Sequence, residues 1–174
     1  MLRSIKKHHS GFSIIELITV IGIMALLTTV VMVNFRQVRA QQEMQSQASE
    51  IISRIRELQT NVLAGRQISG TTTVPSAYQM IFVSGASNYE VDYITSSATT
   101  TLEIVNFSAN MQLKQVNLDG TPIGQVVLRV DSPYGQITAN SLPNKQVRLD
   151  LNHKIMNQVR SVIIDGISGR VGIQ

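Results

Sequence analysis

Residues 11 to 27 read GFSIIELITVIGIMALL, an apolar run with one charged residue, Glu16. The run continues to Phe35, and the 24 residues from Phe12 to Phe35 carry no other charge. At about 1.5 Å per residue such a helix would reach about 36 Å, whereas the hydrocarbon core of a bilayer is about 30 Å thick. The sequence therefore predicts a transmembrane helix over residues 12–35.

The eleven residues before this run, MLRSIKKHHSG, form a short, basic and polar leader, 1–11. Arg3, Lys6 and Lys7 have no acidic residue beside them. Positive charge stays on the cytoplasmic side of a membrane. A secretory signal peptide would have a shorter apolar core and a small-residue cleavage site. The leader thus predicts a single-pass protein of the inner (cytoplasmic) membrane, with its C-terminal domain outside the cytoplasm.

The net charge of +4 is concentrated in that leader, because removing its three cations leaves 12 basic and 11 acidic residues. A nucleic-acid partner remains open but has no support from this balance or from an aromatic content of 5%. The chain has no cysteine, which excludes disulfides, zinc–thiolate sites and thiol nucleophiles.

Helix-compatible sequence continues beyond Phe35 over residues 36–64, which contain no proline and many Gln, Glu, Arg and Ala residues. Apolar residues recur there at spacings of three and four, which places them on one stripe. The stripe consists of Met44, Ala48, Ile51, Ile55, Leu58 and Val62. It is shorter than the three to four heptads of a coiled coil, so packing on the following domain is favoured over a bare stalk. Gly65 is the expected C-terminal stop.

The remaining segment, 65–174, alternates apolar and polar residues in short runs separated by turn sequences such as DGTPIG and DSPYG. This pattern predicts antiparallel strands. The runs are 78–83, 89–94, 101–107, 111–117, 125–130, 145–151 and 161–173. The predicted fold is therefore α+β: a long N-terminal helix, membrane-spanning in its first half and packed by its second half on an antiparallel β-sheet domain.

Residues suited to catalysis are scarce. Two of the three histidines lie in the leader, and His153 near Asp150 is the remaining candidate for a ligand or base, although a structural role on a loop is favoured. No phosphate-binding loop, nucleophile elbow or metal-ligand spacing occurs. We therefore predict no catalytic residue, no cofactor and no metal site, and a protein that is not an enzyme.

The segment KKHHSGFSIIELITVIGIMALL resembles the type IV pilin and pseudopilin family around its prepilin peptidase site. The resemblance implies cleavage between Gly11 and Phe12, N-methylation of Phe12, and a role for Glu16 in subunit assembly. The last hairpin weakly resembles the end of H-type minor pseudopilins and minor pilins. The implied partners are like pilin or pseudopilin subunits, the prepilin peptidase, and an inner-membrane assembly platform with its ATPase.

Glu16 also requires a physical explanation, because an ionised carboxylate at the centre of a membrane helix costs about 2.5 to 3.5 kcal/mol. The positive end of the helix dipole would offset about 0.3 to 1 kcal/mol of that cost. The amine of Phe12, four residues away, would provide a cation on the same face. The family resemblance adds the Phe12 amine of an adjacent subunit. The alternative is a solvated boundary residue without a partner.

The function favoured by these features is that of a structural subunit, a minor pilin or pseudopilin of a type IV pilus or of a type II secretion or competence pseudopilus. It would be processed by the prepilin peptidase and assembled through its N-terminal helix. The alternative is a binding module at a filament tip that holds DNA, a surface or a secreted substrate.

Overall fold

The computed structural model describes residues 13–68, 74–96, 98–166 and 168–174. These residues form one helix, α1 (Ile14–Leu63), followed by eleven strands. The strands are β1 (Ala77–Val83), β2 (Asn88–Ile94), β3 (Thr99–Asn106), β4 (Met111–Leu118), β5 (Thr121–Ile123), β6 (Gln125–Asp131), β7 (Gln136–Ala139), β8 (Leu142–Pro143), β9 (Gln146–His153), β10 (Gln158–Asp165) and β11 (Val171–Ile173). The chain divides between Arg39 and Ala40 into two units, and each unit is described by itself.

The first unit consists of the N-terminal part of α1, up to Arg39. Its first hydrogen bonds run from the backbone N–H groups of Glu16 and Leu17 to the carbonyl oxygen of Ser13, at 3.0 and 3.1 Å. Glu16 lies in the first turn of the helix. There the positive end of the helix dipole favours an anion.

The predicted transmembrane helix is wrong. Among the residues that the structure describes, no helix is both long and apolar enough to cross a membrane. The predicted single-pass location in the inner membrane is wrong with it.

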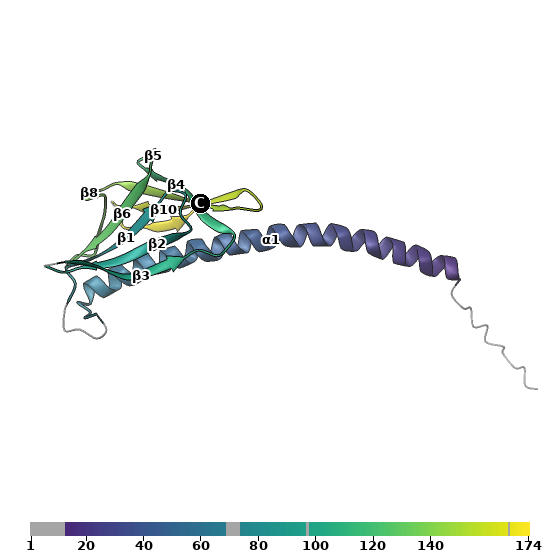
Figure 1. Ribbon diagram of the computed structural model, residues 1–174, viewed down its shortest axis with the longest axis horizontal. Helices are drawn as coiled ribbons and strands as arrows, with labels where there is room; N and C mark the ends of the chain where they lie inside the picture. The colour runs from purple at the N-terminus through teal and green to yellow at the C-terminus, as the bar shows by residue number, and fades with distance from the viewer. Residues whose placement is uncertain (1–12, 69–73, 97, 167) are drawn as a thin grey trace, which may run out of the picture. The chain divides into compact units, whose positions relative to one another are not determined.

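The second unit contains two antiparallel sheets (Figure 1). The six-stranded sheet has the order β3-β2-β1-β6-β7-β8, and the five-stranded sheet has the order β11-β10-β9-β4-β5. In the first sheet Met80 of β1 lies opposite Val91 of β2 and Leu128 of β6. All three side chains are buried, as the alternation of apolar residues predicted.

The core of the second unit lies where α1 residues from 40 onward meet both sheets. All six side chains of the predicted stripe on α1 are buried there. The strands contribute Phe82 and Val91 from the first sheet and Leu149 and Leu151 from the second. A helix with one apolar stripe gains most of its stability from such burial.

α1 ends as the sequence predicted. Gly65 has a φ of +58°, in the left-handed region that glycine adopts without strain. Its N–H donates to the carbonyl of Val62 at 3.2 Å, and the N–H of Arg66 donates to the carbonyl of Asn61 at 3.1 Å. These two bonds form a Schellman motif, which satisfies carbonyls at the helix end.

The predicted fold class is wrong beyond the membrane segment, because the described residues are mostly β, with eleven strands in two antiparallel sheets rather than one. The sequence pattern shows which face of a strand is buried but not which strand lies next to it. It also missed the short strands β5, β7 and β8, of two to four residues each, which are too short to show alternation.

The turn between β4 and β5 shows how a side chain fixes a connection. Asp119 has a φ of +48° and is followed by Gly120. Its Oδ2 accepts a hydrogen bond from Lys145 Nζ at 2.6 Å, and its Oδ1 accepts one from the backbone N–H of Gln146 at 2.9 Å. The bond from Lys145 holds the pKa of the Asp119 carboxyl below its usual value. The turn is thereby tied to the start of β9.

Candidate functional site

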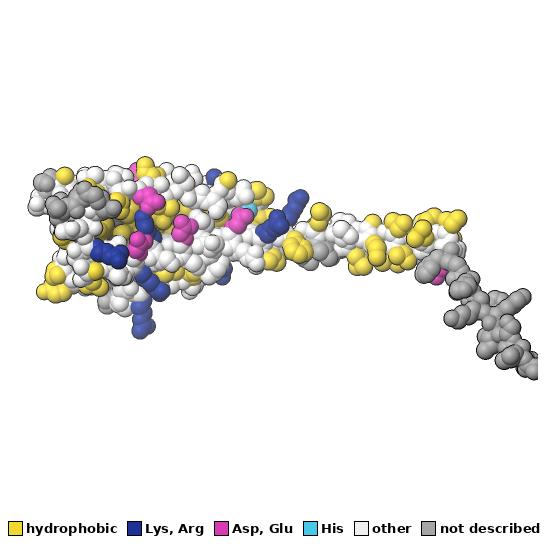
Figure 2. Space-filling view, turned by 90° about the horizontal axis from the view of Figure 1, so that it is seen from below, with side chains coloured by type: hydrophobic (Ala, Val, Ile, Leu, Met, Phe, Trp, Pro, Cys, Tyr) yellow, Lys and Arg dark blue, Asp and Glu magenta, His cyan; other side chains and the backbone are white. Residues whose placement is uncertain are grey.

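The first candidate site is the start of α1, where large apolar side chains are exposed on all sides of the helix. Successive residues of an α-helix are rotated by about 100°, so the adjacent pair Ile14 and Ile15 point in different directions. They are 78% and 73% exposed. The exposed apolar residues of this stretch are Ile14, Ile15, Leu17, Ile18, Val20, Ile21, Ile23, Met24, Leu26 and Leu27. In Figure 2 they form the yellow surface along this part of the helix.

Polar side chains in the same stretch are mostly satisfied by the helix itself. The hydroxyl of Thr19 donates to the carbonyl of Ile15 at 2.7 Å, and the hydroxyl of Thr28 donates to that of Met24 at 2.7 Å. Thr29 donates to Ala25 in the same way, at 2.9 Å. Glu16 differs from them because its carboxylate is exposed and, among the described residues, has no ion-pair partner. The Glu16 carboxylate is therefore the group in this stretch that can still accept hydrogen bonds or pair with a cation.

The other two residues predicted for this site, Gly11 and Phe12, lie outside the described residues. The predicted cleavage, methylation and pairing with Glu16 therefore stay predictions.

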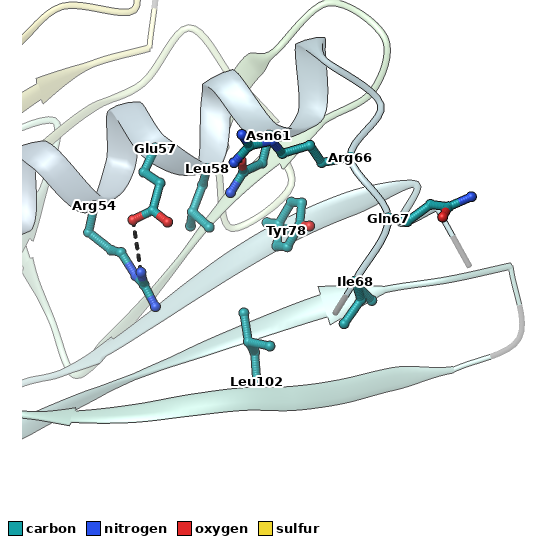
Figure 3. Close-up of a pocket in the computed structure, with 9 residues that line it drawn as sticks. All are labelled: Arg54, Glu57, Leu58, Asn61, Arg66, Gln67, Ile68, Tyr78 and Leu102. Atoms are coloured by element: carbon teal, nitrogen blue, oxygen red, sulfur yellow. Dashed lines mark hydrogen bonds and ion pairs between the residues drawn. The ribbon is translucent and has the colours of Figure 1, made fainter. Parts of the chain in front are cut away.

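A second candidate site lies in the second unit, between one side of α1 and the edge strand β3. Two pockets of about 180 and 220 Å³ lie along it and share Arg54 and Glu57. Figure 3 shows the first pocket, with Arg54, Glu57, Leu58 and Asn61 on α1, and Tyr78 and Leu102 on the strands. We call the two pockets together the α1–β3 groove.

Arg54 is the central charge of the α1–β3 groove. Its Nη1 donates to Glu57 Oε2 at 2.8 Å, and its Nη2 pairs with Glu103 on β3. The guanidinium therefore joins the helix to the edge strand. Its Nε is buried and has no hydrogen-bond partner in the part of the chain that the structure describes.

Tyr89 of β2 lies at the wall of the same groove, and its ring stacks on Phe82 with centroids 5.1 Å apart. Burial, together with the negative charge of Glu50, raises the pKa of the Tyr89 hydroxyl to about 12. Glu103 and Glu57 act in the same direction, and Arg54 opposes them. The hydroxyl thus remains a neutral hydrogen-bonding group over the whole physiological range.

A third polar cluster lies on the face of the five-stranded sheet that carries Asp150. The Asp150 carboxylate accepts hydrogen bonds from Arg148 at 2.7 Å and from the Ser161 hydroxyl at 2.6 Å. Its other oxygen accepts from Asn117 at 3.3 Å. Each member has a partner within the cluster, so its geometry is that of a structural network.

The sequence suggested that His153 lies on a loop. In the structure it is the last residue of β9 and is 5% exposed. Its Nδ1 accepts from the N–H of Met156 at 3.3 Å, and its Nε2 lies 3.3 Å from Glu43 Oε2 on α1. Asp150 lies three residues earlier on the strand, where side chains point to the opposite face. The two residues therefore form no dyad. No group of three or more His, Asp or Glu among the described residues could hold a metal ion.

Comparison with known proteins adds no family to this description: no family model, no curated protein and no solved structure matches the chain.

Sequence reasoning found Glu16 but missed the α1–β3 groove. Arg54 and Glu103 are 49 residues apart, and nothing in the sequence indicates that they meet. The spacing of Glu50, Arg54, Glu57 and Asn61 by four, three and four was the available signal. It places four polar residues on one helix stripe beside the apolar one.

Proposed function

We propose that this chain is a structural subunit of a filament of the pilin or pseudopilin type, assembled by packing of its N-terminal helix against like helices. The observation that carries the proposal is the start of α1, where large apolar side chains are exposed in every direction around one carboxylate. A helix that is apolar all round is normally buried among other elements. Several like helices would cover it.

Glu16 would set the register of that packing. Ion pairs and hydrogen bonds gain strength as water is excluded, and an unpaired carboxylate among apolar helices would be costly. The amine of Phe12 on a neighbouring subunit, freed by cleavage after Gly11, would be its cation. Only one axial offset between two parallel helices brings those groups together, which would give the filament a defined repeat.

The partners that follow from this proposal are further copies of like subunits, the prepilin peptidase, and an assembly platform with its ATPase. The subunit itself would act by packing and would carry no catalytic step.

The test is polymer formation by full-length variants in a host that supplies the prepilin peptidase and the assembly ATPase. Glu16→Gln and Glu16→Ala are expected to abolish sedimentable filaments while the monomer accumulates. Thr19→Val is the matched control, because the Thr19 hydroxyl is already bonded within its own helix. Filaments formed by Glu16→Ala at the wild-type level would refute the proposal.

Processing is tested separately by the intact mass of the purified chain from the same host. The expected mass is that of residues 12–174 plus one methyl group. A chain that keeps residues 1–11 in the presence of an active peptidase would contradict the proposed maturation.

A further inference from the structure

The strand β3 is the longest exposed edge in the second unit. It pairs with β2 along one side, and along the other side no described strand pairs with it. The other sheet edges are the much shorter strands β8, β5 and β11. β3 contains neither proline nor lysine, the residues that commonly block such edges. It therefore presents backbone donors and acceptors to another chain, in a row interrupted once by the register shift between Thr101 and Glu103.

The two faces of β3 differ in chemistry. Glu103 points toward α1, where it meets Arg54, and Val105 lies on the same face, partly buried against the core. Ile104 points to the opposite face and is 52% exposed. A strand added beside β3 would have its own side chains alternating between these two environments.

The face toward α1 is negatively charged near Glu103. Glu50, Glu57 and Glu103 line the groove there with Arg54 as the cation among them. The side chains of Glu57 and Glu103 remain 52% and 50% exposed although both contact Arg54. Arg66 lies at the other pocket, where its Nη1 is 3.4 Å from Asn61 Oδ1. A further cation near Glu103 would be attracted.

The same charge argues against a second β3 as the occupant. Two copies of β3 paired antiparallel about Glu103 would place the two Glu103 carboxylates directly opposite each other. Like charges at that position destabilise a strand pair. Charge complementarity favours a basic partner instead.

We propose that β3 and the adjoining groove bind an extended basic segment of another polypeptide by strand addition. The segment would carry Lys or Arg at alternate positions, directed toward Glu57 and Glu103, and apolar residues between them, directed toward Ile104. Main-chain bonds to β3 would supply the pairing, and the alternating side chains would supply selectivity. This surface belongs to the second unit and is separate from the helix packing proposed above.

The binding test uses the full chain and a fluorescent eight-residue peptide of alternating valine and lysine, measured by anisotropy. Saturable binding that weakens as salt rises from about 50 to about 200 mM is expected. The same peptide with an N-methyl group on every residue keeps its charge but loses the backbone donors of both edges, and should not bind. Equal binding of the methylated peptide, or no binding of the parent peptide at about 50 mM salt, would overturn the proposal.

The residue test compares Glu103→Gln with Glu90→Gln. Both remove one negative charge from the same sheet, but Glu90 lies on the opposite face, across from Ile104. Glu103→Gln should weaken binding by about threefold to tenfold and reduce its salt dependence, whereas Glu90→Gln should leave both unchanged. Equal weakening by the two variants would assign the binding to net charge alone and would refute the site. Thermal unfolding of each variant verifies that the fold is kept.

Discussion

At the scale of single residues, Tyr89 gives the clearest pH dependence. Its hydroxyl titrates in the folded protein at a pKa of about 12, whereas an exposed tyrosine titrates near 10. Between those two values the unfolded state has lost the proton and the folded state has kept it. The free energy of unfolding should therefore fall as the pH rises from about 10 to about 12.

Spectrophotometric titration at the tyrosinate band measures this directly. Tyr89→Phe should remove the absorbance step near pH 12 and should flatten the fall in stability over the same range. The chain contains four tyrosines, so the step is resolved by subtracting the curve of the variant from that of the wild type. A difference curve centred near pH 10 would show that Tyr89 is not in the described environment.

Gly166 is a residue whose replacement should be costly for a purely steric reason. A Cβ at this position would lie 2.7 Å from the carbonyl oxygen of Lys145, and the N–H of Gly166 donates to that same oxygen at 3.0 Å. Because the obstacle is backbone, Gly166→Ala should reduce the free energy of unfolding by about 1 to 3 kcal/mol in urea titrations. Gly172→Ala is the control, since a Cβ there meets nothing within 4 Å. Similar losses in both would contradict this explanation.

At the scale of the element, the second half of α1 is held by its apolar stripe. Ile55 is 2% exposed and lies in the core between the helix and the sheets. Ile55→Ala should therefore reduce the free energy of unfolding by about 2 to 5 kcal/mol. Arg56→Ala, at the exposed neighbouring position, should change it by less than about 0.5 kcal/mol. Chemical denaturation followed by circular dichroism distinguishes the two.

The elements also show what sequence reasoning could reach. The stripe from Met44 to Val62 follows from helical spacing alone, and Gly65 from the backbone conformation that a helix end requires. The division into two sheets could not be reached in this way. β4 pairs with β9, whose sequence lies about thirty residues away, and alternation in either strand is the same whichever partner it has. The α1–β3 groove was missed for the same reason, because the sequence pattern does not show that Arg54 and Glu103 meet.

The membrane segment is a different case. The run from Phe12 to Phe35 was predicted to span a bilayer from its count of apolar residues, whereas among the described residues no helix is both long and apolar enough to cross a membrane.

At the scale of the whole molecule, every member of the hydrophobic core lies at residue 44 or later. We therefore expect residues 40–174 to unfold cooperatively as an isolated fragment, with a urea midpoint close to that of the same transition in the full chain. A shorter fragment, residues 60–174, lacks most of the apolar stripe of α1 and should show no cooperative unfolding transition. A disordered 40–174 fragment would show that the first unit is needed for the second to fold.

The turn at Asp119 has a consequence for how the protein ages in storage. Among aspartate-containing sequences, aspartate followed by glycine is especially prone to succinimide formation, in which the next backbone nitrogen attacks the side-chain carboxyl. Here both carboxyl oxygens of Asp119 accept hydrogen bonds, from Lys145 and Gln146, which an isolated peptide lacks and which hold the side chain in place. Isoaspartate should consequently accumulate at this position far more slowly in the native protein than in a peptide of the same sequence.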